Sequence, residues 1–288
     1  MKSADAGDAG LTSGLYVVAT PIGHLSDLSA RAIDVLTHVD VVAAEDTRVA
    51  RTLLAHVGAH PQLLSTHAHN EVRSAQTIVR MLQAGQRVAL TSDAGTPGIS
   101  DPGARVVAAV HTAGLPVIPV PGPAAVTTLL SVAGLSDGRF RFEGFLPPRS
   151  AARRERLAAL ARSDVAVVLY ESPHRIEQTV ADLAGALEPQ RTVVIGRELT
   201  KRFEQVHRCA AGELPGWLQA DPDRRRGEFV LVFEAAPPQS VSEAHVDAVL
   251  RALCGELPTK QSSRIAARIT GLAADDLYRR ALAMRGRD

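Results

Sequence analysis

Two clusters of charged residues follow apolar runs that have the composition of buried strands. Glu45, Asp46 and Arg48 come directly after one such run, and Glu198 and Lys201 follow another in the second half of the chain. Carboxylates and a lysine can move protons, and an arginine can clamp an anion. Polar groups at the carboxyl end of a strand belong to a site more often than to a core, a solvated sheet edge being the alternative.

A loop rich in glycine and proline occupies residues 90–103, with the sequence LTSDAGTPGISDPG. Its composition excludes both a helix and a ladder strand. Asp93 and Thr96 lie where the preceding apolar run ends, and we expect Ser100 and Asp101 to cap the helix that follows. Because a glycine-rich turn lets a ligand approach the main chain, the loop predicts a ligand site, a tight chain reversal being the alternative.

These residues need a sheet whose strands present their carboxyl ends at one edge. Apolar runs alternate with segments of helical spacing over the first part of the chain, which predicts a largely parallel α/β sheet. In the second half, the segment GEFVLVFE alternates like a half-buried strand. The expected strands cover residues 15–19, 39–44, 88–90, 115–120, 165–169, 192–195 and 227–234.

Two further segments could contact an anionic partner. Residues 140–156 carry several arginines against Glu143 and Glu155, which fits phosphate contact and a solvated helix start equally well. The segment from residue 242 onward has the pattern of short helices, the last two joined at Gly271 as in a helix-turn-helix. This is a weak nucleic-acid signal, because such helical pairs are commonly plain packing modules.

Composition limits the class of protein. The chain has 288 residues, 45% of them hydrophobic and 22% charged, as expected for a globular protein of two domains. Its formal net charge of +1 requires local basic clusters for any polyanionic partner. Cys209 and Cys254 show no Cys-x-x-Cys spacing, and His67 and His69 have no suitably spaced third ligand, so we expect no metal site and a cytoplasmic protein. No apolar run approaches the roughly 18 residues of a membrane span.

Several familiar motifs are missing. The sequence contains no Gly-x-Gly, no Gly-Lys and no Gly-x-Ser-x-Gly. These absences exclude the dinucleotide fingerprint, the usual glycine loop of the commonest methyltransferase fold, the P-loop and the nucleophile elbow.

Nine motifs in order resemble the RNA-modifying branch of the tetrapyrrole methylase superfamily, and the match extends over about residues 14–288. The resemblance implies two α/β domains, with a largely parallel N-terminal sheet, a mixed C-terminal sheet and a small helical appendix. It also implies an S-adenosylmethionine-dependent enzyme that methylates the ribose 2′-hydroxyl of a cytidine in small-subunit (16S) ribosomal RNA, as a homodimer. The motifs are TPIGHLSDLSARA, AEDTR, HAHNE, TSDAGTPGISDPG, VPGPAA, GFLPPR, ESPHR, RELTK and GEFVLVFE.

The motifs also imply site residues. Transfer of a methyl group from a sulfonium to a hydroxyl needs mainly positioning, and a general base adds about a hundredfold or more. The base is left open among Glu45, Asp46, Glu171, Glu198 and Lys201, with Arg48 beside them as a clamp. Substrate phosphates are assigned to Arg149, Arg153, Arg175 and Arg197, and S-adenosylmethionine to Pro21, Asp93, Gly95, Thr96, Ala124, Ala125, Tyr170 and Leu199.

Two other functions remain open at this point. A tetrapyrrole C-methyltransferase would use the same fold but would need an open apolar trough, and a non-catalytic nucleic-acid-binding protein would leave the charged clusters unexplained.

We expect a disordered tail over residues 1–13, α/β domains over residues 14–121 and 122–238, and the helical appendix over residues 239–288.

Overall fold

The structure, a computed structural model, describes residues 11–135, 138–237 and 243–285. Contacts divide the chain into two compact units, Met1–Ala235 and Ala236–Asp288. Most of the expected N-terminal tail lies outside the described residues. The division of the first unit between residues 121 and 122 stays a prediction, with the last strand of one sheet before it and a helix of the other sheet after it.

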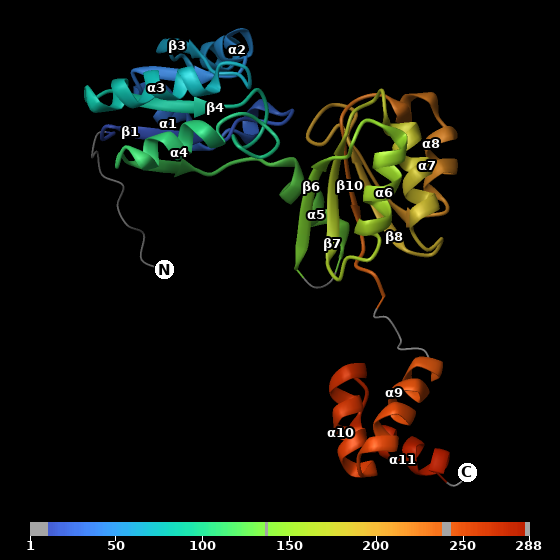
Figure 1. Ribbon diagram of the computed structural model, residues 1–288. Coiled ribbons are helices and arrows are strands. Elements are labelled where there is room, and N and C mark those ends of the chain that lie inside the picture. Colours follow the sequence, from blue (N-terminus) through green and yellow to red (C-terminus); the bar gives the residue numbers. More distant parts are fainter. Residues whose placement is uncertain (1–10, 136–137, 238–242, 286–288) are drawn as a thin grey trace. The chain divides into compact units, whose positions relative to one another are not determined.

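The first sheet has five strands in the order β3-β2-β4-β1-β5 (Figure 1). All of its strand pairs are parallel, which confirms the expected parallel sheet. Strand β3 was not expected, because its short edge sequence QLLS has no continuous apolar run. The strands are β1 (Gly14–Val18), β2 (Val41–Ala44), β3 (Gln62–Ser65), β4 (Arg87–Thr91) and β5 (Val117–Val120).

Helices cover both faces of this sheet because side chains alternate along each strand. One core cluster joins Tyr16 and Val18 to α1 and α2, and the other joins Leu15 to α3 and α4. Helix α2, which begins at Thr47 and includes Arg48 of the first charged cluster, was not expected. The helices are α1 (Ala30–His38), α2 (Thr47–Val57), α3 (Glu71–Gln83) and α4 (Ala104–Thr112), with a 3-10 turn η1 (Leu25–Asp27).

The second sheet is mixed, as expected, with the strand order β6-β7-β10-β8-β9. Strand β6 pairs with β7 in parallel, and the other pairs are antiparallel. Strand β10 is buried at every position because helices cover both faces of the sheet, over Val230 on one face and over Leu231 on the other, so the expectation of a half-buried strand there is wrong. The strands are β6 (Phe140–Phe145), β7 (Ala166–Glu171), β8 (Thr192–Arg197), β9 (Gln205–Ala210) and β10 (Phe229–Phe233).

Helix α5 covers one face of the second sheet, and α6, α7 and α8 cover the other. The cluster under α5 also includes Leu199, and Ile22 of the first half of the chain packs against it. Residues that follow strands of the two sheets are therefore in contact. The elements are α5 (Ala125–Ala133), α6 (Ser150–Leu160), α7 (Ile176–Ala186), α8 (Leu214–Gln219) and a 3-10 turn η2 (Pro222–Arg225).

The second unit is a small helical module with its own core, formed by α9 (Glu243–Glu256), α10 (Thr259–Thr270) and α11 (Ala274–Arg285). Val246 and Leu250 of α9 pack with Ala266 and with Leu277 of α11. Helix α10 ends at Gly271, whose φ of 73° is the left-handed conformation that glycine adopts without strain. In the described part of the chain, no helix is long and apolar enough to cross a membrane.

Candidate active site

Three loops at the carboxyl ends of the first sheet are joined by hydrogen bonds. Thr20 and Gly95 form an isolated antiparallel bridge, with amide-to-carbonyl distances of 2.8 and 3.0 Å. The Thr96 hydroxyl donates to the Pro123 carbonyl at 3.0 Å. Gly95 has a φ of 82°, so glycine is needed for the bridge to form without strain. The loops after β1, β4 and β5 thus form one rigid wall.

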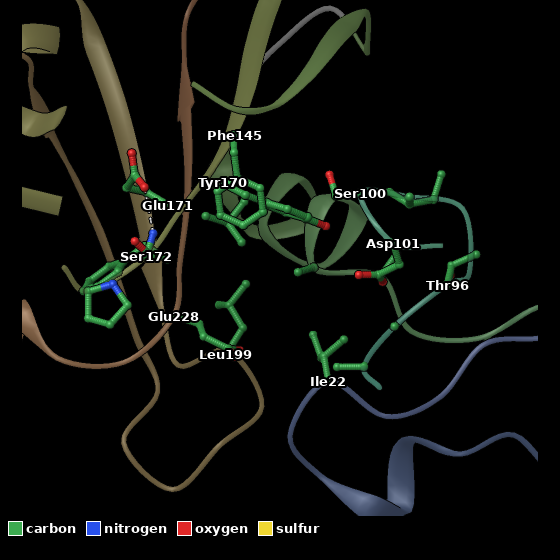
Figure 2. A pocket seen from close by; sticks show the side chains of 18 residues that line it. Ile22, Thr96, Ser100, Asp101, Phe145, Tyr170, Glu171, Ser172, Leu199 and Glu228 are labelled. Atoms are coloured by element: carbon green, nitrogen blue, oxygen red, sulfur yellow. Dashed lines mark hydrogen bonds between the residues drawn. The ribbon is translucent and has the colours of Figure 1, made fainter. Parts of the chain in front are cut away.

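A pocket with a volume of about 330 Å³ lies against this wall (Figure 2). Its other wall comes from the second sheet, so both halves of the first unit contribute. The size suits a small organic ligand. The lining residues are Ile22, Ala94, Gly95, Thr96, Ile99, Ser100, Asp101, Ala124, Ala125, Phe145, Tyr170, Glu171, Ser172, Pro173, Leu199, Glu228, Phe229 and Val230.

Tyr170 supplies the largest polar side chain of the second wall. Consecutive residues of a strand point to opposite faces, so Tyr170 and Glu171 at the end of β7 diverge. The Tyr170 ring packs edge-on against Phe142 and Phe145, at centroid distances of 4.9 and 5.8 Å. It reaches toward Ser100 and Asp101 of the first half of the chain (Figure 2). Burial raises the pKa of Tyr170, so its hydroxyl stays protonated.

The Glu171 carboxylate is fully engaged by neighbouring groups. It accepts from the Ser172 amide at 2.8 Å and from the Thr179 hydroxyl at 2.6 Å, and Arg175 lies at 3.4 Å. Arg175 also donates to the carbonyl of Leu146 at 2.7 Å, so it ties the loop after β6 to the end of β7. Both residues thus hold the pocket wall in place, and the contacts of Glu171 leave it poorly placed to act as a base.

Glu198 and Lys201 form an ion triad with Glu228 at the rim of the pocket. The Lys201 ammonium lies 3.0 Å from Glu198 and 2.9 Å from Glu228. Burial alone would lower the pKa of Lys201, but the two carboxylates outweigh it and raise the pKa. A lysine held in this way stays charged and is a poor base. The loop also contacts the first half of the chain, where the His24 amide donates to the Thr200 hydroxyl at 3.2 Å.

Asp101 lies in the pocket and does not cap a helix. The expected cap is wrong: α4 begins at Ala104, and Glu71 of α3 accepts from the amides of Gly103 and Arg105 at 2.9 and 3.0 Å. The buried Glu71 carboxylate therefore caps α4, the role that was expected for Ser100 and Asp101. Burial first, and then the charge of Glu45, raises the pKa of Asp101 from 3.8 to about 6.

The first charged cluster is near this group but does not line the pocket. Asp46 caps α2 by accepting from the Arg48 amide at 2.8 Å, and its ion pair with Arg48 lowers its pKa to about 2. Asp93 accepts from the Asp46 amide at 2.9 Å, so it holds the loop after β2. Burial and the charge of Asp93 raise the pKa of Glu45.

The four arginines assigned to substrate phosphates have different environments. Arg153 is buried against Asp182 at 2.7 Å, and Arg197 is buried with its guanidinium donating to the carbonyls of Arg226 and Phe203. Neither can reach a phosphate, because both are buried beside the second sheet with their guanidinium groups hydrogen-bonded to protein atoms. Arg149 is exposed at the start of α6.

The pocket brings together six of the eight residues assigned to the methyl donor: Gly95, Thr96, Ala124, Ala125, Tyr170 and Leu199. Pro21 and Asp93 do not line it. Asp101, Phe145 and Glu228 were missed. Asp101 lies in the loop that indicated a ligand site, but its position before a proline suggested a helix cap, and a carboxylate 30 residues away took that role.

Comparisons with known proteins identify the family. A family model described as Tetrapyrrole (Corrin/Porphyrin) Methylases matches residues 14–215. A second family model, described as RsmI C-terminal HTH domain, matches residues 240–285. Ribosomal RNA small subunit methyltransferase I of Escherichia coli O157:H7 is 44% identical over 274 residues, which are 94% of this chain and 96% of that protein. This chain belongs to the ribosomal RNA small subunit methyltransferase I family. The expectation of a methyltransferase is thereby confirmed.

Solved structures share the fold of this family at low sequence identity. The methyltransferase CobJ aligns with a TM-score of 0.58 and 20% identity, covering 78% of this chain and 95% of that protein. Uroporphyrin-III C-methyltransferase from Thermus thermophilus, complexed with S-adenosylhomocysteine, aligns with a TM-score of 0.54 and 17% identity, covering 76% and 96%. These similarities confirm the tetrapyrrole methylase-like fold.

The chemistry of the pocket fits the methyl donor of this family. S-adenosylmethionine combines a purine, which suits apolar walls, with a sulfonium, which would be repelled by a cation beside it. The described lining residues include Ile22, Phe145 and Leu199 as apolar walls, and they include no lysine, arginine or histidine. Their ionisable acids are Asp101, Glu171 and Glu228. The described lining therefore offers no side-chain cation to a ligand bearing phosphates, whereas the Asp101 carboxylate, which has no cation beside it among the described residues, would attract a sulfonium.

Proposed function

We propose that the chain methylates the 2′-hydroxyl of a cytidine in small-subunit ribosomal RNA and uses S-adenosylmethionine as the donor. The observation that carries the proposal is the pocket. Its walls are largely apolar, and its described lining residues include three carboxylates but no lysine or arginine. S-adenosylmethionine supplies an activated methyl group there. The substrate class is supported by the name of the relative from Escherichia coli O157:H7, which covers nearly the whole chain.

The chain's own residues would do three things in this reaction. The main chain of the loops around Gly95 and Ala124 would bind the donor, with Leu199 and Tyr170 closing the pocket from the second wall. The apolar residues would exclude water, and the joined loops would keep the acceptor aligned. Positioning of this kind supplies much of the acceleration of a group transfer.

RNA phosphates would lie outside the pocket, because its described lining residues offer them no lysine, arginine or histidine. Arg48 is highly exposed at the start of α2, and Arg149 follows the lining residue Phe145 by four positions. We assign phosphate contacts to these two arginines and, in the second unit, to the helical module. Exposed arginines bind phosphate through counterion release, so this part of the affinity depends on salt.

We further propose that the protein acts in the cytoplasm and as a homodimer. Both proposals come from the family resemblance of the nine motifs. Sedimentation equilibrium of the purified protein would measure the oligomeric state, and a monomer at micromolar concentration would contradict the dimer.

The reaction is tested with purified protein, labelled S-adenosylmethionine and small ribosomal subunits from a strain that lacks the enzyme. Nuclease digestion and mass analysis should place the label on the ribose of a cytidine. A subunit reconstituted with a 2′-deoxy nucleotide at that position should accept no methyl group. Label on the base, or transfer to the deoxy substrate, would contradict ribose methylation.

A further inference from the structure

Asp101 differs from the other carboxylates of the pocket in having no cation beside it among the described residues. Glu171 is held by Ser172, Thr179 and Arg175, and Glu228 is held by Lys201. Asp101 is half-buried, and its side chain points into the pocket (Figure 2). It is thus the lining carboxylate whose oxygens are most available to a ligand.

The groups that face Asp101 favour proton binding by its carboxyl. From the loop after β2 comes the charge of Glu45, and from the loop after β4 come the charge of Asp93 and the hydroxyl of Ser92. From β7 comes the protonated hydroxyl of Tyr170, whose pKa is raised in part by Asp101. Two negative charges and burial make the ionised form costly, and the single hydrogen bond from Ser92 offsets this only in part.

The other candidates for a base are occupied. Glu198 accepts from Lys201 and from the Glu228 amide, which lowers its pKa although burial opposes this. Lys201 remains an ammonium between two carboxylates. Asp46 accepts from the Arg48 amide as the cap of α2 and forms an ion pair with the Arg48 side chain.

We propose that Asp101 accepts the proton of the acceptor ribose hydroxyl, a role that rests on the proposed function. In this step the hydroxyl O–H bond breaks and its proton passes to the Asp101 carboxylate. The oxygen bonds to the methyl carbon, the carbon–sulfur bond breaks, and its electron pair stays on the neutral thioether. The Asp101 proton then returns to solvent as the product leaves. A base that titrates near the working pH is best suited to this task.

The first test compares Asp101→Asn with wild type in single-turnover methylation of small ribosomal subunits between pH 5 and 9. The wild-type rate should rise with pH and level off above about 6, where Asp101 is ionised. Asp101→Asn should be slower by about a hundredfold or more and should lose this break. Glu228→Gln is the matched control: it removes one carboxylate from the same pocket and, whatever its rate, should keep the break.

Two measurements without turnover separate this role from others. Calorimetry with S-adenosylhomocysteine should give Kd values for Asp101→Asn and wild type that agree within about threefold. Infrared titration of the donor-free protein, wild type minus Asp101→Asn, should show one carboxyl band with a midpoint near pH 6. A Kd raised more than tenfold would make Asp101 a donor ligand and would overturn the proposal.

Failure of this proposal is distinguishable from failure of the proposed function. An unchanged rate and an unchanged break in Asp101→Asn, with the 2′-deoxy substrate still inert, would overturn only the role of Asp101 and would point to Glu45 or to positioning alone. Methylation of the deoxy substrate by wild type would instead overturn the ribose acceptor, whatever the variant does.

Discussion

Gly95 and Gly98 form a matched pair of positions in the loop after β4. Both have a φ of 82°, where an alanine costs roughly 1–2 kcal/mol. A Cβ on Gly98 would meet no atom within 4 Å, and one on Gly95 would meet Ile22 at 3.4 Å, an ordinary contact. Both alanine variants should therefore fold, with similar losses of unfolding free energy.

The two variants should differ in donor binding. Gly95 lines the pocket and forms the bridge to Thr20, whereas Gly98 does neither. Relief of the strain at position 95 would break bridge hydrogen bonds worth about 1 kcal/mol each. If binding must restore the loop at a cost of about 1–2 kcal/mol, Kd rises roughly five- to thirtyfold.

The assay is calorimetry with S-adenosylhomocysteine, together with thermal unfolding of both variants. Gly95→Ala should weaken binding by the stated factor, and Gly98→Ala should change Kd by less than about threefold. Equal Kd values for the two variants, at equal stability, would refute the reasoning and remove Gly95 from the donor site.

Three further predictions follow from specific contacts. Since the pKa of Asp101 is raised to about 6, its ionisation destabilises the fold above that pH. Asp101→Asn should therefore raise the free energy of unfolding at pH 8 by about 1 kcal/mol, after allowance for solvent screening. At pH 4 the variant and the wild type should have the same free energy of unfolding. Glu71→Ala removes the acceptor for two amides at the start of α4 and should cost about 1–3 kcal/mol in urea unfolding; a loss under 0.5 kcal/mol would contradict this. Truncation after Ala236 should leave donor Kd unchanged and reduce the salt dependence of RNA binding; an equal salt slope would make the module a packing element.

Much of the fold follows from local pattern. The apolar runs before Asp93 and Glu198 are strands because only a continuous run of this kind can be buried on both faces of a sheet. Edge strands β3, β6 and β9 escaped detection, since half-exposed strands need no apolar run. The half-buried pattern read from GEFVLVFE was wrong because helices pack on both faces of the sheet at β10.

Within the site, the sequence by itself located the loops and, through the family motifs, six residues that line the pocket. Glycine widens and proline narrows the range of backbone conformations at its own position, so their effect can be predicted from the residues themselves. The roles of the charged groups were decided by tertiary structure. Arg153 is paired with Asp182, and Glu71 caps a helix that starts more than 30 residues later. A charge is available for chemistry only when no distant partner neutralises it, and for Asp101 that depended on which groups the fold brought beside it.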